Sequence, residues 1–310
     1  MSPGASGPAG PAAGDDRPGK PAAWFEAVRP KTLWAGVTPV FVGTACAVSV
    51  GGSRPGPALA ALGTALGLQI GTNLSNDVLD FDRGADTEKR VGPRRAVQSG
   101  LLSRGEVWGG AWCAFGAAVL CGLYLASVAG WPVLAVGAVA IASGLLYTAG
   151  PWPLAYVGLG DVFVLLFFGF AAVVGTTWVQ ALSAPPAAWW AGLAVGSLSV
   201  AILVTNNLRD EETDAAAGKR TLIVRFGRRF GLIEYAAFLG VAFLAVLPTV
   251  AILGPWPMLS WLALPFAVAV LRSVWRGEGA ALNEALAATA RLLLLFGVLL
   301  SIGIALEASG

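Results

Sequence analysis

Long apolar runs recur along most of this chain, and short polar segments separate them. About nine runs approach the length that a helix needs to cross the hydrocarbon core of a bilayer. They lie near 34–50, 57–75, 108–127, 131–149, 158–181, 189–206, 231–252, 256–275 and 286–306. Tryptophans stand close to many of their ends, as expected for an aromatic belt at the headgroup level. The pattern predicts an all-α integral membrane protein with about nine transmembrane helices.

The first 23 residues differ from the rest of the chain. Residues 1–23 consist mostly of Gly, Pro, Ala and Ser, and they lack the apolar centre of a signal peptide. Such a segment buries too little apolar area to order itself. We therefore expect a disordered cytoplasmic tail over 1–23 and a transmembrane domain over 24–310.

Composition supports the membrane prediction and limits the chemistry. The chain has 310 residues, of which 56% are hydrophobic and 12% are charged, with a mean hydropathy of +0.71. Soluble domains carry about 25% charged residues, so lipid must cover most of this surface. The sequence contains no histidine, which excludes imidazole acid–base chemistry and histidine metal ligation.

The basic residues predict an orientation. If the N-terminus lies inside, all 20 Lys and Arg residues except Arg54 and Arg291 fall in the tail, in cytoplasmic loops or at cytoplasmic helix ends. This distribution follows the positive-inside rule. We expect a multi-pass protein of the cell membrane whose two long polar loops, 76–107 and 207–230, are cytoplasmic.

Each long loop begins with an acidic motif at the end of an apolar run. The first contains Asn76 and Asp80, and the second contains Asn206 and Asp210 with the same spacing. The Lys-Arg pairs at 89–90 and 219–220 also coincide when the two motifs are aligned, which indicates a weak internal repeat.

Clustered carboxylates at a membrane boundary need a positive partner. Because no His or Cys lies nearby, the available ligands are oxygen atoms, which suit Mg²⁺. The alternative is a solvated acidic loop paired with its own basic residues.

Several motifs resemble those of a known family. They are Arg-Pro-Lys-Thr-Leu at 29–33, Asn-Asp-x-x-Asp at 76–80, Gly-Pro-Arg-Arg-Ala-Val-Gln-Ser-Gly at 92–100, Gly-Leu-Gly-Asp within 158–169, Asn-Asn-Leu-Arg-Asp at 206–210 and Gly-Lys-Arg-Thr-Leu at 218–222. The chain resembles the UbiA superfamily of membrane prenyltransferases, and within it the naphthoate branch of menaquinone synthesis. The superfamily usually has an acidic residue where this chain has Gly84, and Asp86 resembles the displaced acidic residue of that branch.

The resemblance implies a fold and a reaction. Helices would surround a central cavity that the two motif loops cap. Mg²⁺ would bridge acidic residues to a polyprenyl diphosphate, and an aromatic acceptor would attack the allylic cation. The implied acceptor is 1,4-dihydroxy-2-naphthoate, which would lose CO₂ and give demethylmenaquinol. The expected surroundings are a lipid bilayer, and no nucleic-acid partner is expected.

The resemblance and the motif chemistry together suggest roles for individual residues. The candidate metal ligands are Asn76, Asp77, Asp80, Asp86, Asn206, Asp210 and Asp214. The candidate diphosphate-binding residues are Lys89, Arg94, Lys219 and Arg220, which could instead be charges that only set topology. The candidate residues of the substrate cavity are Asn73, Tyr147 and Tyr156, although both tyrosines could be ordinary interfacial residues.

Catalysis is expected to depend on four of the polar residues in these motifs. They are Asp80, Asp210, Lys219 and Asp161. Asp161 stands just inside an apolar run, where a carboxylate is costly. It could orient the acceptor, act as a base or cap a helix.

Two alternatives remain at this stage. The first is a prenyltransferase of the same superfamily with another acceptor, such as 4-hydroxybenzoate. The second is a cation-coupled transporter, because intramembrane carboxylates also mark ion pathways. Transporter sites usually lie near the bilayer midplane, whereas both acidic motifs stand at helix ends.

Overall fold

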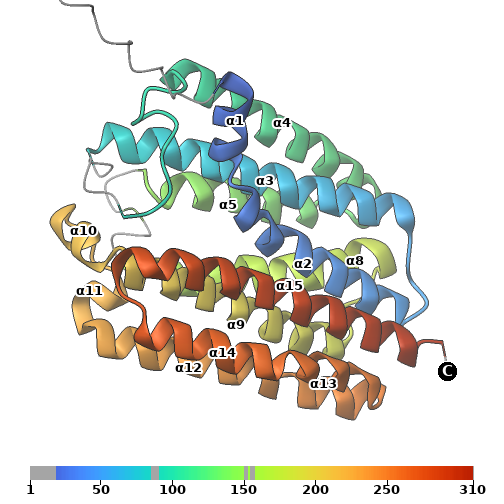
Figure 1. Ribbon diagram of the computed structural model, residues 1–310. Helices are drawn as coiled ribbons and strands as arrows, with labels where there is room; N and C mark the ends of the chain where they lie inside the picture. Colours follow the sequence, from blue (N-terminus) through green and yellow to red (C-terminus); the bar gives the residue numbers. More distant parts are fainter. Residues whose placement is uncertain (1–18, 85–90, 150–152, 154–157, 310) are drawn as a thin grey trace, which may run out of the picture.

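The computed structural model describes residues 19–84, 91–149, 153 and 158–309. Within these residues every regular element is a helix (Figure 1). The first half contains α1 (Lys20–Val28), α2 (Pro30–Val48), α3 (Pro55–Asp82), α4 (Arg104–Ala129) and α5 (Pro132–Leu146).

The middle of the chain forms one continuous helical run followed by the most buried helix. The run consists of α7 (Gly160–Val164), the π-helix η1 (Leu165–Val174) and α8 (Gly175–Ala181). The buried helix is α9 (Pro186–Arg209).

The remaining elements complete the second half. They are α10 (Glu211–Ala216), α11 (Leu222–Phe226), α12 (Arg228–Leu244), α13 (Val246–Leu253), the 3₁₀ helix η2 (Trp256–Ala263), α14 (Leu264–Arg276), the 3₁₀ helix η3 (Gly279–Ala281) and α15 (Leu282–Glu307).

Seven helical runs in the described part of the chain are long and apolar enough to cross a membrane. They are Pro30–Val48, Arg104–Ala129, Gly160–Ala181, Pro186–Arg209, Arg228–Leu253, Trp256–Arg276 and Gly279–Glu307. The predictions of an all-α fold and a multi-pass membrane protein are therefore confirmed. The count of nine is not confirmed: α5 has only 15 residues, and α3 is not among the seven although it has 28.

Local sequence signals explain where several helices begin. Proline is the first residue of α2, α3, α5 and α9, a position whose N–H has no helical partner in any case. Helix α4 begins with a capping box, in which the Ser103 side chain accepts from the Glu106 backbone N–H and the Glu106 side chain accepts from Ser103. These residues favour the observed helix starts through local contacts alone.

The N-terminal boundary differs from the sequence prediction. Helix α1 begins at Lys20, so residues 20–23 belong to a helix rather than to the expected tail. Ala23 and Ala27 are buried in a cluster with residues of α3 and α4, which explains the ordering of this segment. Residues 1–18 lie outside the described part of the chain.

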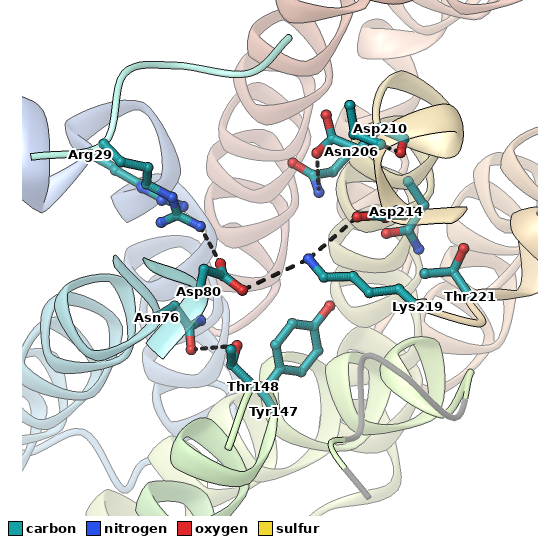
Figure 2. Close-up of a pocket in the computed structure, with 13 residues that line it drawn as sticks. Arg29, Asn76, Asp80, Tyr147, Thr148, Asn206, Asp210, Asp214, Lys219 and Thr221 are labelled. Carbon is teal, nitrogen blue, oxygen red and sulfur yellow. Dashed lines mark hydrogen bonds and ion pairs between the residues drawn. The ribbon is translucent and has the colours of Figure 1, made fainter. Parts of the chain in front are cut away.

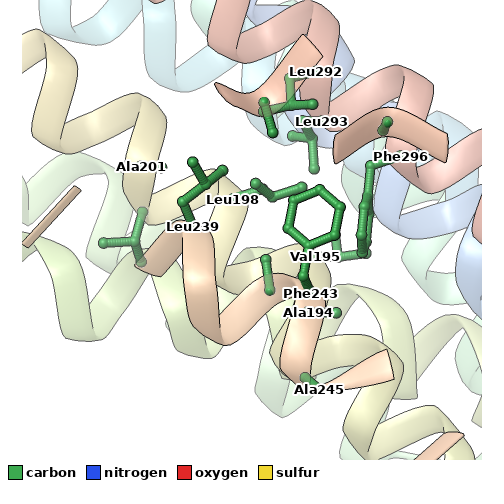
Figure 3. Close-up of a cluster of buried hydrophobic side chains, with 14 of the residues drawn as sticks. Ala194, Val195, Leu198, Ala201, Leu239, Phe243, Ala245, Leu292, Leu293 and Phe296 are labelled. Atoms are coloured by element: carbon green, nitrogen blue, oxygen red, sulfur yellow. The ribbon is translucent and has the colours of Figure 1, made fainter. Parts of the chain in front are cut away.

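The main hydrophobic core lies where α9, α12 and α15 meet (Figure 3). Leu198 of α9 and Leu293 of α15 are fully buried there. Phe243 of α12 packs edge-on against Phe296 of α15, with ring centroids 5.2 Å apart. This packing fixes α9 at the centre of the second half, and α9 carries the second acidic motif at its end.

Small residues allow α9 to approach its neighbour η1. A Cβ atom added at Gly196 would lie only 2.8 Å from the Gly169 Cα. Close backbone approach at small residues is a common way to pack helices in membranes, where apolar surface alone gives no driving force for association. The run 160–181 is thereby held directly against α9.

Both acidic motifs lie at the same end of the molecule. The C-terminal ends of α3 and α9, together with α10 and α11, gather at the left of Figure 1. The C-terminus lies at the opposite end. The fold therefore brings together two motifs that are far apart in the sequence.

Candidate functional site

A polar cavity of about 110 Å³ lies between the two motifs. Its lining residues come from both halves of the chain (Figure 2). They are Arg29, Asn76, Asp80, Arg95, Tyr147, Thr148, Asn206, Asn207, Asp210, Thr213, Asp214, Lys219 and Thr221.

A chain of opposite charges crosses this cavity. Arg95 donates to Asp80 at 2.5 Å, and both side chains are almost fully buried. The other oxygen of Asp80 lies 3.8 Å from the Lys219 ammonium, which lies 3.3 Å from Asp214. Lys219 thus links a carboxylate of the first motif to one of the second. The cationic side chains partly offset the repulsion among the carboxylates.

Asp210 of the second motif is held by its own neighbour. Arg209 donates from Nε to one Asp210 oxygen at 2.7 Å and from a terminal nitrogen to the other at 2.5 Å. The same terminal nitrogen donates to Asn206 Oδ1 at 2.8 Å. The Arg209 guanidinium thus fixes the orientation of Asp210 and Asn206, which both line the cavity.

Neutral side chains complete the wall on the side of the first motif. Thr148 donates to Asn76 Oδ1 at 3.0 Å, and the Tyr147 hydroxyl points toward Lys219 (Figure 2). Tyr147 and Thr148 follow directly after α5. The end of a helix far from either motif in the sequence therefore supplies hydroxyl groups to the same cavity.

Burial raises the pKa of the Asp214 carboxyl above its ordinary value. The nearby charge of Lys219 acts in the opposite direction, and Asp210 adds to the increase. Asp214 lies on α10, outside the membrane-spanning runs. Its carboxylate form would gain from an additional cation in the cavity.

The donor set is compatible with a magnesium ion that also binds a substrate. Asp80 Oδ1 is buried and accepts no hydrogen bond within the described residues, and the other available donors are amide and carboxylate oxygens. In the part of the chain that the structure describes, no three acidic, His or Cys residues converge into a metal site of their own. Mg²⁺ usually uses one or two carboxylates, water and substrate phosphate oxygens, so the residues fit this mode of binding.

Several residues predicted from the sequence line the cavity, and others do not. Those that line it are Asn76, Asp80, Tyr147, Asn206, Asp210, Asp214 and Lys219. Those that lie elsewhere are Asn73, Asp77, Arg94, Asp161 and Arg220. Asp86, Lys89 and Tyr156 lie outside the described residues.

Asp77 has a structural environment that disagrees with its prediction as a metal ligand. Its carboxylate accepts from the backbone N–H groups of Ala96 at 3.0 Å and Val97 at 3.2 Å, and the residue is 1% exposed. Asp77 therefore anchors the loop after the first motif. Asn73 is likewise buried away from the cavity, where it donates to Val28 O and Thr32 Oγ1.

In the described part of the first loop, the arginine that lines the cavity is Arg95, the residue after the candidate Arg94. Arg94 is exposed, whereas its neighbour Arg95 is buried and pairs with Asp80. Arg220 is also exposed. Sequence reasoning missed Arg95 as well as Arg29 and Thr148, because adjacent or isolated residues in loops carry no periodic signal that shows which way they face.

Asp161 lies close to the cavity without lining it. The residue is 7% exposed, and its Oδ1 accepts no hydrogen bond from the described residues. A Cβ added at the preceding residue, Gly160, would lie 3.5 Å from the Tyr147 hydroxyl. A buried carboxylate with an unsatisfied oxygen beside a cavity-lining tyrosine remains a functional candidate.

The fold and the cavity together define a class of protein. The described residues form an all-helical, multi-pass membrane protein with a polar, mixed-charge cavity at the ends of two central helices. Within that class, the chain belongs to the UbiA prenyltransferase family, whose sequence model matches residues 36–295.

Two bacterial relatives are similar over most of their length. The 1,4-dihydroxy-2-naphthoate octaprenyltransferase of Mycobacterium tuberculosis is 40% identical, over 83% of this chain and 88% of that protein. The Escherichia coli protein of the same name is 36% identical, over 92% of this chain and 96% of that protein. Because the chain belongs to a prenyltransferase family, the alternative of a cation-coupled transporter is not favoured.

Solved structures share the fold at low sequence identity. A UbiA homolog from Aeropyrum pernix, in its apo form, matches with a TM-score of 0.70 and 17% identity, over 89% of this chain and 98% of that one. A UbiA homolog from Archaeoglobus fulgidus bound to DMAPP and Mg²⁺ matches with a TM-score of 0.63 and 15% identity, over 90% and 99%. These matches confirm the predicted family fold.

Proposed function

We propose that this protein transfers a polyprenyl chain from polyprenyl diphosphate to 1,4-dihydroxy-2-naphthoate, releasing CO₂ and diphosphate and forming demethylmenaquinol. The supporting observation is the single cavity in which Asp80, Lys219 and Asp214 join the two motifs. The names of the bacterial relatives support the acceptor and a place in menaquinone biosynthesis. The proposed prenyltransferase domain extends from α1 to the C-terminus.

We assign the diphosphate and metal end of the reaction to the polar cavity. Its volume of about 110 Å³ is small for a whole substrate, because ligand pockets usually measure about 300–1,000 Å³. The proposed Mg²⁺ ligands are Asn76, Asp80, Asn206, Asp210 and Asp214, with Asp86 as a further candidate. Bound Mg²⁺ would supply positive charge that neutralises the departing diphosphate.

Basic side chains of the chain itself contribute to the same neutralisation. Lys219 lies between Asp80 and Asp214, where its ammonium can turn to a phosphate oxygen. Arg29 and Arg95 also line the cavity. Lys89 and Arg94 belong to the same loop as Arg95, and Arg220 belongs to the loop of Lys219; these three are assigned to the approach of the anionic substrate.

The reaction breaks the allylic C–O bond and the C–C bond to the carboxylate, and it forms one new C–C bond. The electron pair of the allylic C–O bond leaves with diphosphate, and the ring carbon that bears the carboxylate attacks the resulting cation. Loss of CO₂ returns the electrons of its bond to the ring and restores the quinol. The aromatic face of Tyr147 can stabilise the allylic cation, and the surrounding apolar helices exclude water. Tyr156 is a second candidate for this role.

Asp161 is assigned to the acceptor side of the reaction. Its buried carboxylate belongs to the residue after Gly160, which approaches Tyr147, and it is not among the residues that line the polar cavity. There it would accept the proton of a ring hydroxyl as the ring attacks and return that proton after CO₂ leaves.

We also propose that the end bearing both motifs faces the cytoplasm. The support is the excess of Lys and Arg at that end. Cysteines introduced at positions 54 and 224 of a cysteine-free variant should react with an impermeant reagent from opposite sides in intact cells. Labelling of both positions from the same side would contradict this orientation.

A product assay tests the proposed function. Purified protein is supplied with polyprenyl diphosphate, Mg²⁺ and naphthoate that carries a label in its carboxyl group. We expect labelled CO₂, stoichiometric diphosphate and prenylated naphthoquinol, and we expect excess chelator to stop all three. The matched acceptor control is 4-hydroxybenzoate, which would be prenylated with its carboxylate retained.

The outcomes separate the parts of the proposal. Turnover of 4-hydroxybenzoate without turnover of the naphthoate would contradict the acceptor and leave the prenyltransferase assignment in place. Full activity in excess chelator would contradict the role of the metal.

A further inference from the structure

Asn283 connects the two motif regions although it belongs to neither. It lies in the first turn of α15 and is half-buried. Its Oδ1 accepts from Arg209 NH1 at 3.1 Å, and its Nδ2 donates to the backbone carbonyl of Val91 at 3.1 Å. One amide therefore joins the end of α9 to the loop that follows the first motif.

Arg209 is the centre of this arrangement. Its side chain is 3% exposed, and it donates to Asp210, Asn206 and Asn283. The first two line the cavity, whereas Arg209 itself does not. Arg209 instead lines a separate groove behind the second motif, together with Val91 and Glu278. It thus supports the cavity wall from behind.

The hydrogen-bond count leaves Asp210 able to bind a further cation. Each carboxylate oxygen has two lone pairs: Arg209 occupies one on each oxygen of Asp210, and Asn206 Nδ2 donates to Oδ2 at 3.4 Å, which leaves the second lone pair of Oδ1. The guanidinium is planar and rigid, so a partner that fixes its NH1 edge also fixes the Asp210 carboxylate. Asn283 provides that partner.

We propose that Asn283 is a positioning residue for the metal–diphosphate end of the site, acting through Arg209 on Asp210 and Asn206. This inference rests on the proposed function, since it assumes that the cavity binds a metal–diphosphate group. Supporting residues of this kind typically change metal affinity or activity by about 10–100-fold when they are lost. No local signal in the sequence marks the residue, because 74 positions separate it from Arg209 and 192 from Val91.

The test compares two substitutions of similar size. Asn283→Leu removes both hydrogen bonds, whereas Asn283→Asp keeps an acceptor for Arg209 and removes the donor to Val91. Calorimetry with purified protein measures the binding of inorganic pyrophosphate over a series of MgCl₂ concentrations. We expect binding to weaken by about 10–100-fold in Asn283→Leu and to stay close to wild type in Asn283→Asp.

Thr289→Ala is the matched control on the same helix. Thr289 contacts the Tyr235 hydroxyl at 3.1 Å in the core, so its loss weakens α15 without touching either motif. Equal weakening of pyrophosphate binding in Thr289→Ala and Asn283→Leu would overturn the proposal, because it would indicate a general effect on the helix. Wild-type binding in Asn283→Leu, or equal losses in Asn283→Leu and Asn283→Asp, would overturn it too.

A further variant keeps the test decisive if Asn283→Leu does not fold. Arg209→Lys retains the positive charge and loses the planar fork. An unchanged Mg²⁺ dependence of pyrophosphate binding in this variant would overturn the proposal, and weaker binding would support it. Pyrophosphate binding does not use the acceptor, so failure of the naphthoate assay would contradict the proposed function and leave this inference standing.

Discussion

Asn76 and Asp80 end helix α3, and Asn206 and Asp210 end helix α9 with the same spacing. All four line one cavity, but their partners differ. Asp80 pairs with Arg95, which comes from the following loop, whereas Asp210 pairs with Arg209, its own neighbour in the sequence. The first motif therefore depends on how a loop folds back, and the second is largely preorganised within its own helix.

Two further aligned positions show the same contrast. Asp77 holds the backbone of the loop at Ala96 and Val97, whereas the aligned Asn207 lines the cavity. Gly84 has a φ of +67°, whereas the aligned Asp214 is buried and lines the cavity. The two motifs therefore share a position at one cavity, but residues at aligned positions have different structural roles.

Removing one charge from each motif should have the largest effect. Asp80→Asn and Asp210→Asn should each lower turnover by about 10²–10³, because each removes preorganised charge from a site where charge develops. The measurement is the initial rate at saturating polyprenyl diphosphate and Mg²⁺. A loss confined to one variant would show that only one motif serves the reaction.

Asparagine is the suitable replacement because it keeps an acceptor for the neighbouring arginine. Asp80→Ala would remove the carboxylate partner of Arg95, whose side chain is 5% exposed, at a cost of about 3–5 kcal/mol in the free energy of unfolding. A melting curve of each Asn variant checks that the loss of turnover is not a loss of folded protein.

Substitutions of Asp77 and Asn207 should have different effects, because Asp77 anchors a loop whereas Asn207 lines the cavity. Asp77→Ala should lower the free energy of unfolding by about 1.5–3 kcal/mol for each charged hydrogen bond lost and increase hydrogen exchange in the loop 91–103. Asn207→Ala should change the Mg²⁺ dependence of the reaction and leave that loop protected. If Asp77→Ala instead raises the Mg²⁺ requirement with the loop still protected, Asp77 is a metal ligand after all.

The smallest effect is expected at Gly84. Gly84→Ala should cost about 1–2 kcal/mol, because an alanine side chain disfavours the left-handed backbone conformation. No described atom lies within 4 Å of an added Cβ, so no clash contributes. Gly84→Asn should cost less, since asparagine tolerates this conformation. A melting curve distinguishes the two, and equal losses would contradict a backbone origin.

The sequence by itself determined the helical class, most of the long helices and several of their ends. Apolar runs of sufficient length predicted the membrane-spanning helices, since a helix satisfies the backbone groups of a single segment within that segment. Prolines at helix starts and the capping box at Ser103 fixed several boundaries locally. The spacing of Asn76 and Asp80, and of Asn206 and Asp210, identified both motifs because residues on one helix face recur at short intervals.

Only the tertiary structure decided which polar residues face the cavity. Arg94 and Arg95 are adjacent in a loop without periodicity, and Asp77 holds the backbone N–H groups of Ala96 and Val97 just after them. In this backbone arrangement Arg95 donates to Asp80 and Arg94 is exposed. Asn283 became part of the site through hydrogen bonds to Arg209 and Val91, which are distant in the sequence. Such contacts depend on how whole helices pack and rotate, and no short stretch of sequence contains that information.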